Sequence, residues 1–102
     1  MEDRFQDKRH IRWAKDVKAR DNYECQICRA TNVYLHSHHL NSYDVFVNQR
    51  YDINNGITLC FRCHTEFHLI FSKGRNTKFQ FEQYKKSIEI FKKVLLKKYC
   101  KG

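Results

Sequence analysis

The sequence contains no proline, only three glycines and no long run of apolar residues. A chain with so little proline and glycine is not a collagen, a linker or a low-complexity segment. Its apolar stretches are far shorter than the about 20 residues that a membrane-crossing helix needs. Three of the first four residues are charged and no apolar segment follows them, so a secretory signal peptide is not expected. These absences predict a protein that is neither secreted nor embedded in a membrane.

What the chain does contain is enough for one folded domain. It has 102 residues, of which 41% are hydrophobic and 15% aromatic, and these fractions exclude disorder throughout. The 20 lysines and arginines outnumber the 11 acidic residues, which gives a formal net charge of +9. A charge of this sign suits a polyanion such as nucleic acid or an anionic membrane surface, and it also simply favours solubility. Charge alone does not decide among the three.

Four of the five cysteines form two C-x-x-C pairs, Cys25 with Cys28 and Cys60 with Cys63. Two such pairs are typical of a tetrahedral zinc site, because thiolates are soft ligands that two short loops can present to one ion. This zinc would be structural, since four thiolates leave no position for water. A pair of redox dithiols is the alternative. The fifth cysteine, Cys100, is expected to be an idle free thiol.

Three stretches can be separated along the chain. Residues 1–20 predict a basic N-terminal helix, and residues 73–102 predict a longer basic amphipathic helix that begins near Thr77 and Gln80, a capping-box pair. The central stretch, residues 21–72, holds both cysteine pairs and all but one of the histidines.

The central stretch also has its own secondary-structure signals. Residues 32–40 predict a strand, and residues 57–59 a second, short one after an Asn-Gly turn. A short helix is expected from His64 to about Phe71.

Four histidines of this stretch suggest a reactive site. His64 and His68 are four residues apart on the expected helix and share one face, a spacing that can chelate one metal. His38 and His39 are adjacent on a strand and therefore point to opposite sides. One of the two can join the helix histidines on a metal, while the other can act as a general base near neutral pH.

The two remaining histidines are expected to have packing or surface roles. For His10 no functional interpretation competes with this one. His36 lies on the same strand face as His38, so a place beside the metal ligands is the alternative for that residue.

Three separately spaced motifs resemble the HNH endonuclease family. They are LHSHHL at residues 35–40, NGITLC at residues 55–60 and CHTEFH at residues 63–68. The resemblance covers about residues 13–84. It implies an α+β fold with a small ββα-metal core and a structural four-cysteine zinc site, flanked by the two helices, in a single nuclease domain over residues 1–102.

The family's roles transfer to matching positions of this chain. The resemblance implies that His39 is the general base, that Asn55 orients it, and that His38 and His64 bind the catalytic metal. His68 would be a further ligand, as in the colicin-like variant of the family. Many members have Asp at the position of His38. An all-imidazole site is softer, and favours Mn, Co, Ni or Zn over Mg.

The resemblance implies metal-dependent hydrolysis of DNA phosphodiester bonds, by nicking or by double-strand cleavage. Double-stranded DNA would be the partner, and a monomer in the cytoplasm of a bacterial or phage-infected cell is expected, with a dimer as the alternative. Candidate phosphate contacts are Arg12, Arg20, Arg50, Arg62 and Arg75. Three other functions remain open: a non-catalytic zinc-stabilised DNA-binding module, an accessory subunit of a phage DNA-packaging machine, and a thiol oxidoreductase.

Overall fold

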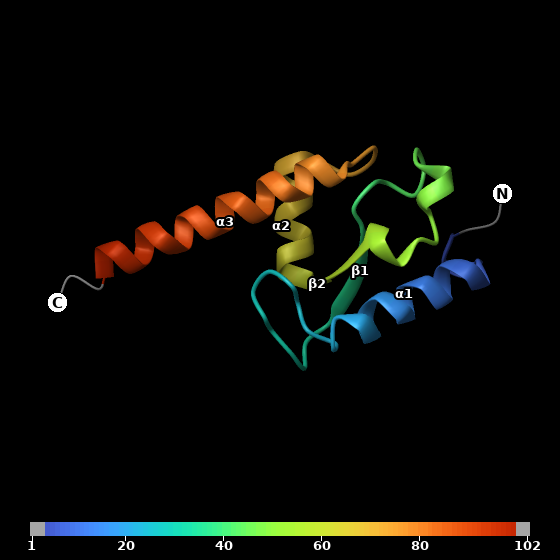
Figure 1. Ribbon diagram of the computed structural model, residues 1–102, viewed down its shortest axis with the longest axis horizontal. Coiled ribbons are helices and arrows are strands. Elements are labelled where there is room, and N and C mark those ends of the chain that lie inside the picture. The colour runs from blue at the N-terminus through green and yellow to red at the C-terminus, as the bar shows by residue number, and fades with distance from the viewer. Residues whose placement is uncertain (1–3, 100–102) are drawn as a thin grey trace.

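The computed structural model describes residues 4–99, with the backbone alone for residues 95–99. Cys100, the expected free thiol, lies outside the described residues. The elements in chain order are a 3-10 helix at Arg4–Gln6, α1 (Lys8–Arg20), β1 (Leu35–His39), 3-10 helices at Val47–Gln49 and Ile53–Asn55, β2 (Gly56–Cys60), α2 (Phe61–Phe71) and α3 (Lys78–Tyr99) (Figure 1). None of the described helices is long and apolar enough to cross a membrane.

A two-stranded antiparallel sheet lies at the centre, with α1 on one face and α2 on the other (Figure 1). In its register His39 pairs with Gly56, His38 with Ile57, and Leu35 with Cys60. The expected α+β fold, with two strands followed by a helix, is therefore confirmed.

Helix α1 packs on the sheet through His10, Trp13 and Val17, which follow one another at helical spacing and are buried. Asp7 caps the start of this helix, because its carboxylate accepts a hydrogen bond from the Arg9 backbone. Its contact with β2 requires a glycine, because a Cβ atom at Gly56 would lie 2.5 Å from a Val17 methyl carbon and 2.6 Å from the Trp13 ring. The helix and the strand therefore approach each other closely at this point.

The hydrophobic core lies on the other face of the sheet, between β2, α2 and α3. Its buried members are Cys25, Ile27, Leu40, Leu59, Cys60, Cys63, Phe67, Phe81 and Tyr84. Phe67 of α2 is fully buried and contacts the rings of both α3 aromatics of this set. The core thus joins three of the paired cysteines to the helices.

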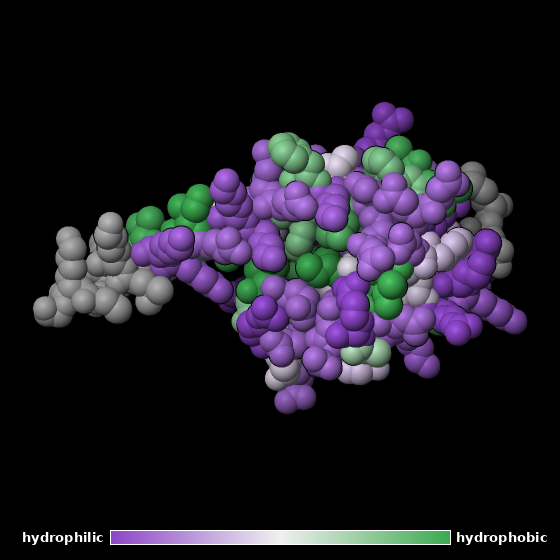
Figure 2. All heavy atoms as spheres, viewed as in Figure 1, coloured by the Kyte–Doolittle hydropathy of each residue, from purple (hydrophilic) through white to green (hydrophobic). Residues whose placement is uncertain are grey.

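Helix α3 begins with the expected capping box. The Gln80 backbone donates to Thr77 Oγ1 at 3.3 Å, and the Thr77 backbone donates to Gln80 Oε1 at 3.1 Å. The first turns pack on α2, and the remainder extends away from the body (Figure 1). Exposed apolar side chains gather over this outer part, among them Phe91 and Val94 (Figure 2).

Two elements of the central stretch differ from the expectation. The first strand starts at Leu35 rather than Asn32, because positive φ angles at Arg29 and Asn32 turn the chain before it. Helix α2 starts at Phe61, three residues earlier than expected, because Cys60 caps it. Its sulfur accepts a hydrogen bond from the Cys63 backbone at 3.4 Å. The usual capping residues Ser, Thr, Asp and Asn accept the same bond through a side-chain oxygen.

Candidate functional site

Four cysteines from two turns meet beside the hydrophobic core. Cys25 and Cys28 lie in the loop after α1, whereas Cys60 ends β2 and Cys63 is in the first turn of α2. Their sulfur atoms lie within 4.8 Å of one another, and Cys28 Sγ is 3.6 Å from Cys60 Sγ. Tetrahedral zinc with Zn–S bonds of about 2.3 Å requires sulfur atoms roughly 3.8 Å apart, far beyond the length of a disulfide. The cluster is therefore compatible with a zinc site.

Backbone N–H groups point at two of these sulfur atoms. The Cys28 N–H donates to Cys25 Sγ at 3.5 Å, in addition to the Cys63 N–H that donates to Cys60 Sγ. Burial raises the pKa of Cys25, but backbone hydrogen bonds outweigh burial and lower that pKa to about 7. Burial raises the pKa of Cys28 and Cys63. Without a bound cation the four sulfurs cannot all be thiolates, because their negative charges would repel one another. A bound metal ion would balance this charge and allow all four to be deprotonated.

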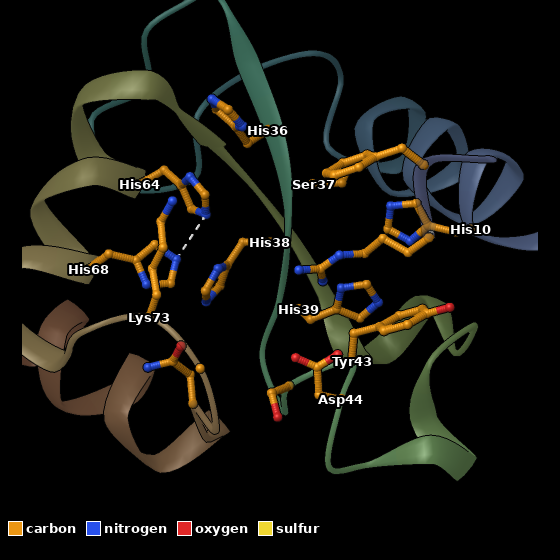
Figure 3. A pocket seen from close by; sticks show the side chains of 15 residues that line it. His10, His36, Ser37, His38, His39, Tyr43, Asp44, His64, His68 and Lys73 are labelled. Carbon is orange, nitrogen blue, oxygen red and sulfur yellow. Dashed lines mark hydrogen bonds between the residues drawn. The ribbon is translucent and has the colours of Figure 1, made fainter. Parts of the chain in front are cut away.

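A second group of possible ligands lies between β1 and α2. One ring nitrogen from each of His38, His64 and His68 lies within 4.8 Å of the other two, and the three rings face one another between the strand and the helix (Figure 3). His64 Nε2 is 3.2 Å from His68 Nε2. Two imidazoles bound to one ion at about 2.1 Å would have nitrogen atoms roughly 3.0–3.4 Å apart. The histidine pair on α2 is thus already at chelating distance.

Two further observations fit a metal at this group. His38 Nε2 is buried and has no hydrogen-bond partner among the described residues. His68 Nδ1 lies 3.1 Å from the Ser72 carbonyl oxygen, so Nδ1 donates a proton and Nε2 keeps the lone pair that a metal needs. Burial lowers the pKa of His38 to about 3 and that of His64 to about 4, which keeps both imidazoles in their neutral, ligating form.

His36 lies beside this group and does not belong to it. Its ring stacks on that of His64, with centroids 4.6 Å apart and an interplanar angle of 24°. This stack fits the packing role expected for His36, and it equally fits the alternative of a place beside the metal ligands.

His39 lies on the opposite face of β1, against α1 (Figure 3). The separation of the histidine doublet by strand geometry is therefore as expected. His39 Nε2 is 2.9 Å from the Arg50 carbonyl oxygen, which only accepts, so Nε2 carries the proton and Nδ1 carries the free lone pair. Burial lowers the pKa of His39 to about 4. The ring is therefore neutral at pH 7, the state in which it can accept a proton.

Asn55 reaches His39 only through the intervening loop. Its side-chain oxygen accepts from the Asn41 backbone at 2.8 Å, and its nitrogen donates to the carbonyls of Asn41 and Gln49 at 2.9 and 3.1 Å. These bonds fasten the loop whose next residue, Arg50, holds the His39 ring. The orienting role implied by the family is thus available to Asn55, by way of the backbone.

A cavity of about 500 Å³ is lined both by the three possible metal ligands and by His39 (Figure 3). Its lining includes Arg4, His10, His38, His39, Ser42, Tyr43, His64, His68 and Lys73. Arg4 stacks on Tyr43, on the side of His39, whereas Lys73 lies close enough to His64 to lower its pKa. Neither cation has an acidic partner among the described residues. The cavity is therefore a groove with histidines at its centre and a cation on each side.

None of the five arginines expected to contact phosphate lines this cavity. They are Arg12, Arg20, Arg50, Arg62 and Arg75. Arg20 stabilises the fold, because it pairs with Asp21 and donates to the carbonyls of Ile53 and Gly56. Arg50 donates to the Tyr43 carbonyl and stacks on its ring. The other three side chains are exposed outside the groove.

Sequence reasoning gave no functional role to several residues of the groove region, among them Arg4, His10, Tyr43 and Lys73, nor to Trp13, which lies against His39. His10 and Trp13 could have been found, because they lie on the same face of the N-terminal helix as Val17, at spacings of three and four. No sequence signal distinguishes Arg4 and Lys73 from the other cations of the chain.

Comparison with known proteins gives two matches. The profile of the family described as HNH endonuclease matches residues 25–68, a segment that contains the paired cysteines, His38, His39 and both α2 histidines. The chain is 37% identical over 59 residues to Anaredoxin of Nostoc sp. (strain PCC 7120), an alignment that covers 58% of this chain and 75% of that protein. No solved structure matches the chain.

Proposed function

We propose that this chain, which belongs to the HNH endonuclease family, hydrolyses DNA phosphodiester bonds with one divalent metal held by His38, His64 and His68. The observation that carries the proposal is the groove itself. It brings a three-imidazole cluster and a neutral, unliganded histidine together from opposite faces of one strand. A protein whose only metal site is the four-cysteine cluster would need neither the three-imidazole cluster nor an unliganded histidine beside it.

His39 would be the proton acceptor. Its Nδ1 atom takes a proton from the water that attacks phosphorus, while Nε2 remains hydrogen-bonded to the Arg50 carbonyl. That bond also stabilises the protonated ring, because a carbonyl oxygen accepts a stronger hydrogen bond from imidazolium than from neutral imidazole. A divalent ion bound at the three imidazoles supplies a Lewis acid for the phosphate oxygens and the leaving 3′-oxygen. The family resemblance implies 5′-phosphate and 3′-hydroxyl products.

Arg4 and Lys73 would bind the phosphates on either side of the scissile one. Both line the groove, on opposite sides of the histidines, and lack an acidic partner among the described residues. Removing one phosphate-binding cation should make the slope of log K against log salt concentration shallower by about 0.9. We therefore expect Arg4→Ala and Lys73→Ala to reduce that slope, whereas Lys86→Ala, on exposed α3, should leave it unchanged.

The decisive experiment is cleavage of supercoiled plasmid by the purified protein with Mg, Mn, Co, Ni or EDTA. We expect metal-dependent cleavage, and a loss of about 10²–10⁴-fold in rate for His39→Ala. Binding of Co²⁺, followed by its visible absorption, should persist in that variant because His39 is not a ligand. Cleavage at the wild-type rate by His39→Ala would refute the assignment of the base.

Two alternatives without intrinsic nuclease activity predict a different result. A zinc-stabilised DNA-binding module, or an accessory subunit of a phage DNA-packaging machine, would bind DNA in a salt-sensitive way and cleave it with none of these metals. The accessory subunit would gain activity only with its partner.

A redox function at the cysteines is the second candidate, because the name of the Nostoc relative includes "redoxin". A cluster of four cysteine sulfur atoms suits iron as well as zinc. Metal analysis of the purified protein separates the cases. One zinc per chain, with no reactive dithiol until the metal is chelated, supports the structural site; iron or free dithiols would support the redox function.

A further inference from the structure

The face of β1 that carries His39 contains a feature that the proposed reaction does not yet use. The indole ring of Trp13 lies flat against the His39 imidazole, with ring centroids 3.7 Å apart and an interplanar angle of 10°. His10 adds a third ring, stacked at 5.5 Å from each of the other two. One whole face of the imidazole is therefore covered by an aromatic plane.

Trp13 is itself held from several directions. Its Nε1–H donates to the Asp52 carbonyl at 2.8 Å, and only 3% of the residue is exposed. Its ring also lies against the backbone of Gly56, where an added Cβ would be 2.6 Å away. Gly56 is the residue that pairs with His39 across the sheet. The indole is thus wedged between the strand backbone and the imidazole that it covers.

Two contacts together define the orientation of the His39 ring. The Trp13 stack fixes the plane of the imidazole, and the hydrogen bond to the Arg50 carbonyl fixes its rotation within that plane. With both in place, Nδ1 has one direction. Proton transfer requires the lone pair to lie within hydrogen-bond reach of the water, and a misplacement of about 1 Å can cost about 10²-fold in rate.

We infer that Trp13 is a positioning residue for His39, and that Gly56 belongs to the same device because it leaves room for the indole. The inference rests on the proposed role of His39 as general base. A core residue of no further consequence would need only apolar bulk at this place. A positioning residue needs a flat ring face. A substitution that keeps the apolar bulk but removes the ring therefore distinguishes the two roles.

The test compares Trp13→Leu, which keeps apolar bulk, with Trp13→Phe, which keeps an aromatic face, and with Gly56→Ala, which keeps Trp13 but displaces it. DNA cleavage is measured with the metal-loaded protein below the unfolding temperature of each variant. We expect kcat to fall about tenfold or more in Trp13→Leu and Gly56→Ala, and by less in Trp13→Phe. KM should stay within about twofold in all three, because Arg4 and Lys73 are untouched.

A second measurement does not depend on activity. In ¹⁵N NMR spectra of the histidine rings, wild-type His39 should be a single Nε2–H tautomer with ring protons shifted upfield by the indole. The tautomer should become mixed in Trp13→Leu and Gly56→Ala, while the signals of His64 and His68 stay unchanged.

The outcomes separate the two proposals. A Trp13→Leu protein that retains both the wild-type kcat and the single tautomer overturns the role of Trp13. Should that variant not fold, the same result in Gly56→Ala overturns it instead. A wild-type protein that cleaves nothing refutes the proposed function, and the tautomer comparison then decides on the stack alone.

Discussion

Replacing Cys25 with serine tests the structural role of the four-cysteine cluster. Cys25 is fully buried and packs in the same core as Leu59 and Phe67. Serine is nearly isosteric with cysteine, so the change removes a thiolate ligand and opens only a small cavity. The energetic effect therefore reports mainly on metal binding.

The expected magnitude follows from the coordination. Structural zinc supplies about 10–16 kcal/mol of apparent binding free energy at pH 7, or about 3 kcal/mol for each of four thiolates. A loss of about 3 kcal/mol in a domain of this size lowers Tm by roughly 12–24 °C. That loss is a large share of the roughly 5–15 kcal/mol by which such domains are stable. The variant should be partly unfolded near 37 °C.

The assay is thermal unfolding followed by circular dichroism, with bound zinc counted by native mass spectrometry. Cys100→Ser is the matched control, because it removes a thiol that belongs to neither C-x-x-C pair. We expect Cys25→Ser to bind zinc more weakly and to unfold at a lower temperature, and the control to change in neither respect. An unchanged Tm in Cys25→Ser would refute the assignment of the four cysteines to one ion.

Three further changes have defined outcomes. Burial raises the pKa of Asp21, but hydrogen bonds from Arg20 and Thr58 outweigh burial, so the net pKa is lowered from 3.8. Asp21→Asn should cost about 1.5–3 kcal/mol in urea unfolding at pH 7. The difference from wild type should shrink as the pH falls through this lowered pKa, because the protonated carboxyl no longer favours the folded state. Phe67→Ala should cost about 3–5 kcal/mol and weaken Co²⁺ binding, because the Phe67 ring also contacts His38. Gln80→Ala should cost about 1 kcal/mol, the contribution of a capping hydrogen bond, which lowers Tm by about 4–8 °C, and it should leave cleavage unchanged.

The features that short-range spacing determines could be predicted from the sequence. Each C-x-x-C pair brings its two sulfurs together because the pair closes within one turn. His64 and His68 share a helix face because they are four residues apart, and His38 and His39 part because neighbouring strand residues alternate. The capping box of α3 is equally local. Each of these follows from the geometry of a single element.

Features that depend on how elements meet could not be predicted in this way. The stack of Trp13 on His39 joins residues 26 positions apart, and only the packed sheet brings them together. Charge alone selects the five arginines, whereas the groove is lined by Arg4 and Lys73. The sequence places the start of α2 too late because the capping residue is a cysteine, which is rare among capping side chains. The packing of elements against one another decides the aromatic stack and the cations of the groove. An unusual capping residue decides where α2 starts.

The position of Cys63 directly before His64 couples the two clusters through the rotation of α2. Each residue turns an α-helix by about 100°, and Cys63 lies in the first turn of α2. One residue inserted between Cys63 and His64 would swing both ligand histidines by about 100°, away from His38, without changing any ligand. Four inserted residues would return them to within about 40° of their present direction. The cysteine cluster fixes the rotation of α2 about its own axis, and that rotation sets the direction of His64 and His68. The number of residues between the two clusters is therefore as important for the histidine site as its side chains are.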